Sequence, residues 1–547
     1  MIDIQAKVRS AYARIAEVDR PEVWIFLRAK EDVLAEAAAI EARVARGERL
    51  ALAGQLVAVK NNIDVHGIAT TAGCPSYADP PSVDSDAVRL LRAAGAIVLG
   101  STNLDQFATG LVGTRSPYGA VRNAVDPARI SGGSSSGSAV AVALGIVDFA
   151  LGTDTAGSGR VPAALNGIVG VKPTKGLIST VGVVPACASL DCVTVFARDL
   201  PTARRALAAM TTTALAPGKV GPYRVGVPLD GQLGELAEGW SEAFSSATKK
   251  LAALGVEVVS IDFTPFLAAA QLLYDGAFVA ERYTAVGAFI ANASADLDPT
   301  VARIIRAAAD IPAHRLFADQ KKLAGLKVIA DATLAGLDAI LTPTTTQHPT
   351  LAQVSAEPIA INSSLGRFTN FANLLDYCAV AVPAGKVSGL PFGVMLTGPA
   401  HTDATIAALG ELLAEPTIEI AVVGTHLTGQ PLNSQLTERG GQFIRATTTA
   451  PHYRLFALDT IPPKPALVRA AEGGAAIEVE VWLLTAAHFG SFVAALPQPM
   501  AIGRLDLADG SQVSGFTCEP IALEGRVEIT QYGGWRAYLA SRDARRT

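Results

Sequence analysis

Three short segments of this sequence carry residue types that together could cleave an amide bond. Lys60 ends the apolar run 56–59, a glycine- and serine-rich stretch covers 132–138, and Ser158 lies in a run of small residues at 152–160. A serine hydroxyl needs a base before it can attack a carbonyl carbon. A buried lysine can be that base, because burial disfavours the ammonium form and lowers its pKa. The segments therefore predict a nucleophilic serine with a serine relay and a lysine base, and they require no histidine or metal.

The run before Ser158 predicts the rest of an acyl-transfer site. Thr155, Ala156 and Gly157 are small enough to expose successive backbone N–H groups in one direction. Such donors hold the oxyanion of a tetrahedral intermediate, which is usually the largest single contribution to acyl-transfer catalysis. A polar turn with a capping serine is the alternative interpretation of this run.

The two upstream segments also have simpler interpretations. The 132–138 stretch could be a flexible linker, and Lys60 could be a strand-end lysine that reaches solvent. A linker is disfavoured because the stretch lies between Ile130 and the apolar run 139–144, in the densest part of the core pattern. A phosphate-binding loop is disfavoured too, because no Gly-Lys-Ser or Gly-Lys-Thr follows.

Length and composition limit the classes of protein that fit. With 547 residues the chain is too long for one ordinary core, so we expect two domains, or one large domain with an appendage. Half of the residues are hydrophobic and 17% are charged, which favours a compact interior over disorder. The net charge of -5 is mild and spread out, which gives no electrostatic footprint for nucleic acid.

The cysteines and the apolar segments bear on the compartment. The five cysteines are scattered without paired spacing, which is typical of thiols in a reducing compartment and not of a disulfide framework or a zinc site. The first residues contain no apolar signal region. Apolar stretches such as 139–151 are interrupted and shorter than the ~20 residues that a bilayer requires. We therefore expect a cytoplasmic protein without membrane contact.

The helices and strands predicted around these residues indicate an α/β core. Residues 5–48 are helical in pattern, and continuous apolar runs then alternate with alanine-rich helices, which is typical of a sheet covered on both faces. A mostly helical segment covers about 200–335, and strand pattern returns at 339–344 and 379–383. This order predicts one sheet built from sequence-distant halves. The earlier predicted strands are 57–59, 96–99, 147–151 and 168–171, and the predicted helices are 87–94 and 138–144.

A second, smaller domain is predicted at the C-terminal end. Around 430–450 the sequence becomes polar and rich in glycine, threonine and proline, as in a linker. Beyond it strands dominate, and Asp509-Gly510 between the runs 501–507 and 512–518 is a hairpin signal. We therefore predict a domain over 1–435 and a small β-rich domain over 441–547.

The chemical segments, in this order, resemble the amidase signature family over about residues 25–430. The matching pieces are Val59-Lys60-Asn61-Asn62, Gly132-Gly133-Ser134-Ser135, Asp154 to Ala163, Thr102-Asn103-Leu104-Asp105 and Gly170-Val171-Lys172-Pro173-Thr174. The resemblance implies a Ser–cisSer–Lys triad, with Ser158 as nucleophile, Ser134 (after a cis peptide bond) as proton relay and Lys60 as base. It also implies a mixed sheet covered by helices, with no metal or organic cofactor.

The same resemblance assigns the residues around the nucleophile. The backbone N–H groups of Thr155, Ala156, Gly157 and Ser158 would form the oxyanion hole. Asp154 and Arg160 look like supports for that loop.

Within the family, the likeness is greatest to members that hydrolyse allophanate, a small carboxylated urea. The stretches that carry it are 107–119, 274–283 and 369–376. It implies Tyr274 and Arg282 as the site of the substrate carboxylate, for which the planar guanidinium is well suited.

The spacing of that pair leaves an alternative. The two residues are about two helical turns apart, so both could face one side of a helix. The simpler interpretation is a surface arginine that pairs with Glu281 or Asp275.

The likeness extends to the C-terminal domain, which would be an α+β, cyclotransferase-like fold that few other amidases of this kind carry. The implied products are ammonia and carbon dioxide, with this domain decarboxylating the intermediate. His426 is the candidate for that step and His452 the second, although either could be an ordinary structural histidine. Similar enzymes tend to be homodimers, which we expect here as well.

Three other functions remain open. One is hydrolysis of other small amides, and another is the glutaminase component of a tRNA-dependent amidotransferase. Against the second, Gln106 replaces a glutamate familiar in those proteins, which also lack a C-terminal β domain. A catalytically inactive binding module is disfavoured because Lys60, Ser134 and Ser158 are all present.

Overall fold

The computed structural model describes residues 4–211, 213, 216–292, 295–414, 417–439 and 441–544. They divide into two compact units, Met1–Ala414 and Glu415–Thr547. The division lies earlier than the predicted junction at 435–441. The reason is that β12 (Thr417–Val422) is a strand inside the sheet of the second unit.

A mixed sheet of eleven strands, counted over the described residues, lies at the centre of the first unit. Its strands are β1 (Trp24–Leu27), β2 (Leu56–Lys60), β3 (Ile97–Thr102), β4 (Phe149–Asp154), β5 (Val169–Lys172), β6 (Cys192–Ala197), β7 (Arg224–Pro228), β8 (Glu257–Ile261), β9 (Ala339–Pro343), β10 (Tyr377–Val387) and β11 (Leu390–Pro399). Their order is β1-β3-β2-β4-β6-β5-β10-β11-β9-β7-β8. Strands β3, β2 and β4 are parallel, whereas β6 is antiparallel to both β4 and β5.

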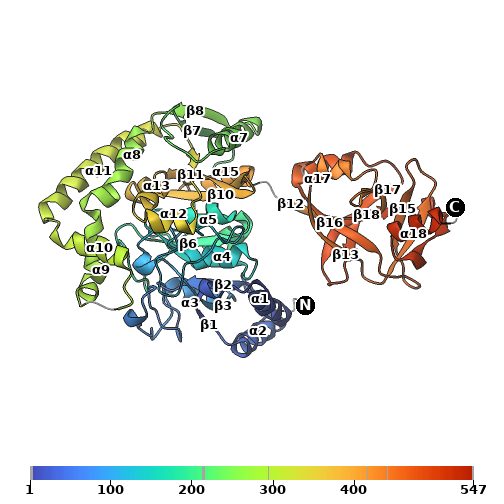
Figure 1. Cartoon of the computed structure of the whole chain (residues 1–547), viewed down its shortest axis with the longest axis horizontal. Coiled ribbons are helices and arrows are strands. Elements are labelled where there is room, and N and C mark those ends of the chain that lie inside the picture. The colour runs from blue at the N-terminus through green and yellow to red at the C-terminus, as the bar shows by residue number, and fades with distance from the viewer. Residues whose placement is uncertain are drawn as a thin grey trace. The chain divides into compact units, whose positions relative to one another are not determined.

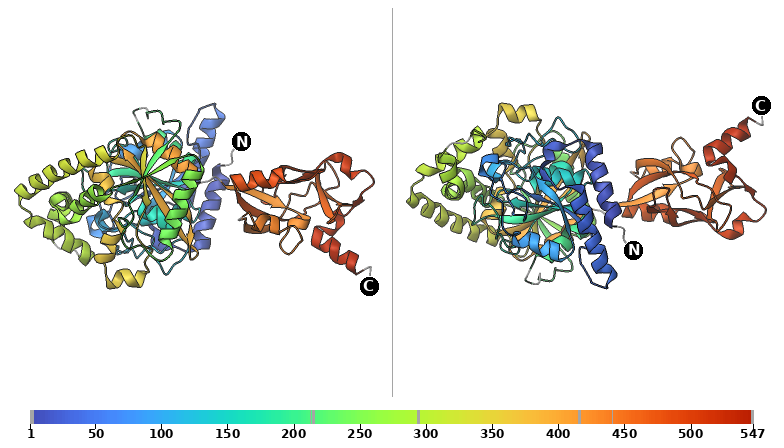
Figure 2. Two further views of the ribbon diagram at one scale, coloured as in Figure 1. Left: turned by 90° about the horizontal axis from the view of Figure 1, so that it is seen from above. Right: turned by 90° about the horizontal axis from the view of Figure 1, so that it is seen from below.

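Helices cover this sheet on both faces (Figure 2). Over the described residues, the helices of the first unit are α1 (Ile4–Val18), α2 (Lys30–Ala45), α3 (Asp86–Ala93), α4 (Ser136–Ala143), α5 (Val161–Asn166), α6 (Leu200–Met210), α7 (Trp240–Ala253), α8 (Thr264–Asp275), α9 (Ala280–Ala291), α10 (Pro299–Ala307), α11 (Ala313–Thr333), α12 (Leu351–Ala356), α13 (Ala360–Leu365), α14 (Asn370–Leu374) and α15 (Asp403–Leu413). Short 3-10 turns are η1 (Pro21–Val23), η2 (Pro75–Tyr77), η3 (Gln106–Ala108), η4 (Ala277–Val279) and η5 (Ala308–Asp310). Figure 1 shows α8 to α11 gathered at one side of the unit. None of the helices in the described part of the chain is long and apolar enough to cross a membrane.

The alternation of side chains along β2 shows why both faces must be covered. Val57 and Val59 belong to one hydrophobic cluster, and Leu56 and Ala58 belong to another. Successive side chains of a strand point to opposite faces, so a continuous apolar run can only be stable with packing on both sides. The predicted covered α/β sheet is confirmed.

The two halves of the sheet meet where sequence-distant strands pair. Val380 of β10 lies opposite Val171 of β5 in an antiparallel register. The expectation of one sheet built from distant halves is therefore confirmed. The segment that leads into β10 contacts the residues after β4, because the Thr369 hydroxyl donates to the Ala156 carbonyl oxygen.

Three strands lie where helix was expected. β1 lies inside the predicted helical region 5–48, and β7 and β8 lie inside the mostly helical 200–335. They are at or near the sheet edges, and each has at most five residues. A short strand contributes little to a pattern that its long helical neighbours dominate, so tertiary pairing decides its conformation.

The second unit is β-rich, as predicted. Its strands are β12 (Thr417–Val422), β13 (Gln442–Thr448), β14 (Tyr453–Leu458), β15 (Lys464–Arg469), β16 (Glu478–Thr485), β17 (Met500–Asp506), β18 (Gln512–Cys518) and β19 (Val527–Glu528). They form one sheet ordered β13-β16-β12-β18-β17 and another ordered β15-β14-β19. The helical elements are η6 (Gly424–His426), α16 (Ser434–Thr437), α17 (Ala486–Ala494), η7 (Pro520–Leu523), η8 (Thr530–Tyr532) and α18 (Trp535–Asp543). The Asp-Gly hairpin is confirmed, because β17 pairs with β18 up to Asp506 opposite Gln512.

Candidate active site

Lys60 is held inside the first unit at the carboxyl end of β2. The neighbouring parallel strand β4 ends at the same edge of the sheet and carries Thr153. The Lys60 Nζ lies 2.8 Å from the Ser134 Oγ and 2.7 Å from the Thr153 Oγ1. The side chain is completely buried, so it does not reach solvent.

Burial changes the protonation of Lys60. Loss of water around the ammonium lowers its pKa from 10.5 to about 7, and the charge of Arg282 also acts to lower it. The carboxylates of Asp105, Asp191 and Asp154 oppose this shift without cancelling it. A substantial fraction of the amine is therefore neutral near pH 7 and can accept a proton from a hydroxyl group.

The serine-rich stretch forms a buried loop and the first turn of helix α4, and it is not a linker. The peptide bond between Gly133 and Ser134 is cis. The Ser134 carbonyl oxygen accepts the Asp105 N–H at 3.1 Å, and the Ser135 hydroxyl donates to the Thr153 carbonyl oxygen at 3.1 Å. All of the serines at 134–136 and 138 are buried. These contacts fix Ser134 beside Lys60.

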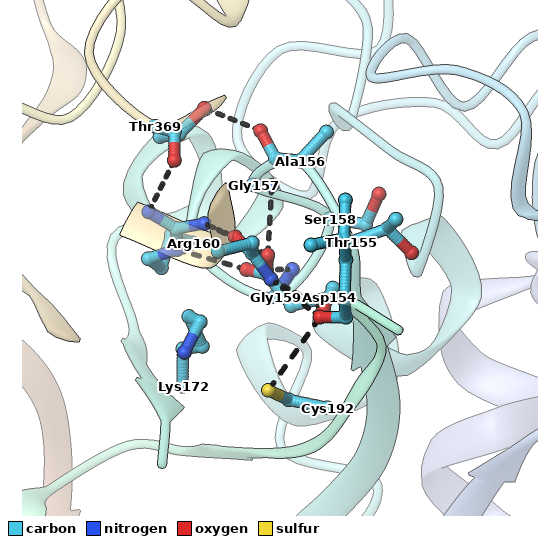
Figure 3. A network of polar contacts seen from close by, with 12 residues as sticks. Asp154, Thr155, Ala156, Gly157, Ser158, Gly159, Arg160, Lys172, Cys192 and Thr369 are labelled. Carbon is cyan, nitrogen blue, oxygen red and sulfur yellow. Dashed lines mark hydrogen bonds and ion pairs between the residues drawn. The ribbon is translucent and has the colours of Figure 1, made fainter. Parts of the chain in front are cut away.

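A buried ion pair shapes the turn that carries Ser158 (Figure 3). Arg160 donates from Nε and Nη2 to the two carboxylate oxygens of Asp154, at 2.9 and 2.8 Å. The same carboxylate accepts the backbone N–H groups of Gly157 at 2.8 Å and Gly159 at 2.9 Å. Burial would raise the pKa of Asp154, but Arg160 and these hydrogen bonds hold it below its usual range. Asp154 therefore stays charged and organises the whole turn.

Helix α14 and the residue before it support the same turn from the other half of the sheet. Arg160 donates from Nη1 to the Thr369 carbonyl oxygen at 3.0 Å and from Nη2 to the Asn373 Oδ1 at 2.7 Å. The Thr369 hydroxyl donates to the Ala156 carbonyl oxygen at 2.6 Å. Gly157 has φ +124°, and a Cβ there would lie 2.3 Å from the Thr369 Oγ1. Only glycine fits this position without moving the turn.

The backbone donors of the predicted oxyanion hole are not equivalent. The Gly157 N–H is already bonded to Asp154. The N–H groups of Thr155, Ala156 and Ser158 have no acceptor among the residues that the structure describes. Thr155 is oriented by its hydroxyl, which donates to the buried carboxylate of Asp191. These three N–H groups are therefore the ones left for a ligand.

Arg282 and Ser158 both contact the same loop, at residues 108–110. It is 2% exposed, and its Nη1 donates to the Thr109 Oγ1 at 2.9 Å and the Ala108 carbonyl oxygen at 3.3 Å. The Ser158 Oγ lies 3.5 Å from the carbonyl oxygen of the next residue, Gly110. The carboxylate of Asp105 holds this loop by accepting backbone N–H groups from residues 112, 113 and 115.

Tyr274 and Arg282 lie near each other, but not on one helix. Tyr274 lies on α8, which ends at Asp275, and Arg282 lies on α9. The expectation of two residues on one helical face is therefore wrong, because the chain turns through Gly276 and η4. The Arg282 guanidinium carbon still lies 5.9 Å from the centre of the Tyr274 ring. No ion pair to Arg282 occurs within the described ranges, so the surface-pair alternative fails too.

His426 lies in the second unit and lines a cavity there of about 270 Å³. Its ring stacks on Phe516 at 4.9 Å, and its Nε2 lies 3.1 Å from the Gln435 Oε1. Burial lowers the pKa of His426, so the ring is neutral at neutral pH. His452 instead lies on the surface and pairs with Asp506 at 2.9 Å, away from this cavity.

Two contacts of this site were not predicted from the sequence. Thr153 bonds to Lys60, and Asp191 bonds to Thr155. The one available signal for Asp191 was a lone carboxylate beside the apolar strand β6. Thr153 gave no signal, because a threonine in a strand is ordinary.

Comparison with known proteins shows the family of this chain. A family model described as amidase matches residues 6–407, and a model of the allophanate hydrolase C-terminal domain matches residues 418–540. The chain belongs to the amidase family and carries that C-terminal domain.

Among known structures it is similar to an allophanate hydrolase from Kluyveromyces lactis. The sequence identity is 37% and the TM-score 0.70, with 98% of this chain and 97% of the other covered. It is also 42% identical to the urea amidolyase of Saccharomyces cerevisiae over 96% of this chain and 31% of the relative. The chain thus spans under a third of the length of the urea amidolyases that it matches. A glutamyl-tRNA(Gln) amidotransferase subunit of Halobacterium salinarum is 34% identical, covering 65% of this chain and 93% of the relative.

Proposed function

We propose that this chain hydrolyses allophanate, a urea that carries a carboxylate on one nitrogen, to ammonia and carbon dioxide. The observation that carries the choice of substrate is the buried Arg282, a cation that has no carboxylate partner in the described part of the chain. A buried charge is costly unless it is paired, and the substrate carboxylate would supply the missing charge. Similarity of nearly the whole chain to the Kluyveromyces lactis allophanate hydrolase supports the same conclusion.

The first unit would cleave the amide bond through an acyl-enzyme. Ser158 attacks the amide carbonyl carbon, its proton passes to Ser134, and the Ser134 proton passes to Lys60. The N–H groups of Thr155, Ala156 and Ser158 stabilise the oxyanion, while Gly157 serves the fold of the turn.

The same relay would complete the hydrolysis. Lys60 returns the proton through Ser134 to the leaving nitrogen, so that ammonia departs and the acyl group stays on Ser158. Water then attacks the acyl group by the same route. The product is a dicarboxylated amine, in which one NH group joins two carboxylates.

The second unit would act on that product, with His426 as the residue at the reacting nitrogen. The C–N bond to one carboxylate breaks, its electron pair stays on nitrogen, and nitrogen gains a proton that comes from solvent as carbon dioxide leaves. The remaining carbamate then yields ammonia and carbon dioxide. The position of His426 in the lining of a cavity supports this role, whereas His452 lies outside it.

Removing the Arg282 charge should weaken binding of the substrate carboxylate. Because a hydrogen bond to a charged group contributes ~1.5–3 kcal/mol, Arg282→Met should raise KM for allophanate by about 10- to 100-fold. At a pH well above 7, where Lys60 is neutral in both proteins, turnover of biuret, in which a neutral amide replaces the carboxylate, should change much less. The same substitution at the exposed Arg303 is the matched control. An equal loss on both substrates would remove Arg282 from carboxylate recognition.

Substitution of His426 should separate the two steps. His426→Gln keeps a group that can bond to Gln435 but loses the imidazole, so we expect unchanged release of the amide nitrogen. Release of the second nitrogen should be delayed until the intermediate decomposes in solution. His452→Gln is the matched control and should release both nitrogens together. Ammonia measured against allophanate consumed, in the first moments of the reaction, reports the difference.

Parallel assays would test the function as a whole. Ammonia release should be rapid from allophanate and slow from glutamine, acetamide and benzamide. Faster release from glutamine would favour the glutaminase component of an amidotransferase, and faster release from the simple amides would favour a general amidase.

We further infer that the chain is a cytoplasmic homodimer that needs no cofactor and binds neither nucleic acid nor membrane. Five buried thiols without a disulfide support a reducing compartment. Light scattering of the purified chain would test the dimer.

A further inference from the structure

The cavity of the second unit has a mostly apolar lining that includes one charged side chain. Most of its wall is apolar, and only a few polar groups face it. The lining residues are Val423, Thr425, His426, Leu432, Gln435, Pro462, Lys464, Pro465, Ala495, Leu496, Pro497, Met500 and Phe516. No aspartate or glutamate is among them, so Lys464 is the charged group that faces this space.

Lys464 is unusual in the second unit. It is the one lysine of the sequence after residue 414, and all the other permanently charged basic residues there are arginines. It is half-buried at the first position of β15, and no carboxylate in the described ranges lies within ion-pair distance of it. The lysine ammonium is a compact charge with three N–H donors. It can therefore pair with a carboxylate oxygen without the planar two-point geometry that arginine requires.

The backbone brings Lys464 and His426 to the same cavity. Gly424, the first residue of η6, packs so closely on the start of β15 that a Cβ there would lie 2.1 Å from the Pro465 Cγ. Burial lowers the pKa of His426, and the charge of Lys464 also acts to lower it. The ring therefore stays neutral beside a cation. A neutral imidazole next to an ammonium leaves net positive charge in an otherwise apolar space.

We propose that Lys464 is the positioning residue of this cavity and that it holds one carboxylate of a small dicarboxylate beside His426. The inference rests on the proposed function, since the ligand would be the dicarboxylated amine that the first unit releases. The apolar wall strengthens the attraction, because a charge pair interacts more strongly where water is excluded. Gln435 holds the His426 ring in place from the side, at 3.1 Å.

Malonate is a stable probe for this site, because it carries two carboxylates on a methylene group where the intermediate has NH. The 547-residue chain would be labelled on its histidines and titrated with malonate, with the histidine ring signals followed by NMR. Disappearance of one signal in His426→Gln assigns that residue. We expect malonate to shift the His426 signal to saturation. Lys464→Met should weaken this binding by about 10- to 100-fold, as for loss of one charged hydrogen-bond partner.

Two further variants guard against trivial explanations. Arg504→Met removes one exposed cation from β17 of the same unit and should leave malonate binding unchanged. Lys464→Arg keeps the charge and should retain most of the binding. The proposal would be overturned if malonate left the His426 ring signal unshifted, or if wild type and Lys464→Met bound malonate with equal affinity. Because malonate is not turned over, failure here is distinct from failure of allophanate hydrolysis, which the ammonia assay reports separately.

Discussion

Ser158→Ala should lower ammonia release from allophanate by about 10⁴-fold or more. Removal of the nucleophile from a serine acyl-transfer site leaves only binding and oxyanion stabilisation to accelerate the reaction. The substitution removes one hydroxyl, which donates a long hydrogen bond of 3.5 Å to the Gly110 carbonyl oxygen. The variant should therefore fold normally, with an unchanged unfolding midpoint. Steady-state ammonia release and a thermal unfolding scan are the measurements.

The serine-rich stretch offers a matched control for this prediction. Ser134→Ala removes the hydroxyl that contacts Lys60 and should also cause a large loss. Ser136→Ala removes a hydroxyl that donates at 3.3 Å to the Asn103 carbonyl oxygen and should change the rate less than about threefold. Equal losses at both positions would mean that the stretch acts only by maintaining the fold.

Lys60→Met should lower the rate by about 10²- to 10⁴-fold, the usual contribution of a positioned general base. The wild type should also show an acid limb in kcat/KM near pH 7. Burial brings the pKa of Lys60 from 10.5 to about 7, so the amine is protonated below that pH and cannot accept a proton. The rate should fall as pH falls through about 7 and level off above it.

A second variant makes the pH prediction specific to Lys60. The charge of Arg282 acts to lower the pKa of Lys60, so Arg282→Met should move the acid limb to higher pH. The exposed Lys175→Met should not move it. A limb that stays in place in Arg282→Met would indicate that another group titrates there.

The sequence predicted the residues that lie at strand ends, and this has a physical reason. Lys60 follows an uninterrupted apolar run, and such a run must be a buried strand whose end lies at one edge of the sheet. The contact between Lys60 and Thr153 was not predictable, because it depends on the relative register of β2 and β4. Side-chain identity says little about such register.

Local backbone geometry was harder to predict from the sequence than the positions of the strand ends. Gly157 was expected to donate to the oxyanion, but its N–H is bonded to Asp154, which itself pairs with Arg160. Tyr274 and Arg282 were expected on one helix, yet the break at Gly276 still leaves them in contact. In both cases the arrangement depends on how the chain turns, and only the three-dimensional fold could decide it.

The domain junction shows the same limit. The segment that forms β12 falls inside the range 1–435 that the sequence predicted for the first domain. It belongs to the second unit because its partners, β16 and β18, lie far along the chain. His426 follows shortly after β12 and so lies well inside the second unit.

Peptide mapping during turnover is the measurement that tests the central claim most directly. The acyl group on serine would be an N-carboxylated carbamoyl group, which loses carbon dioxide in acid to leave a stable carbamoyl ester. After an acid quench of the enzyme with allophanate, we predict a carbamoyl mass increment on the peptide that contains Ser158 and none in Ser158→Ala. A carbamoyl increment on a different residue, or sustained ammonia release by Ser158→Ala, would contradict the account.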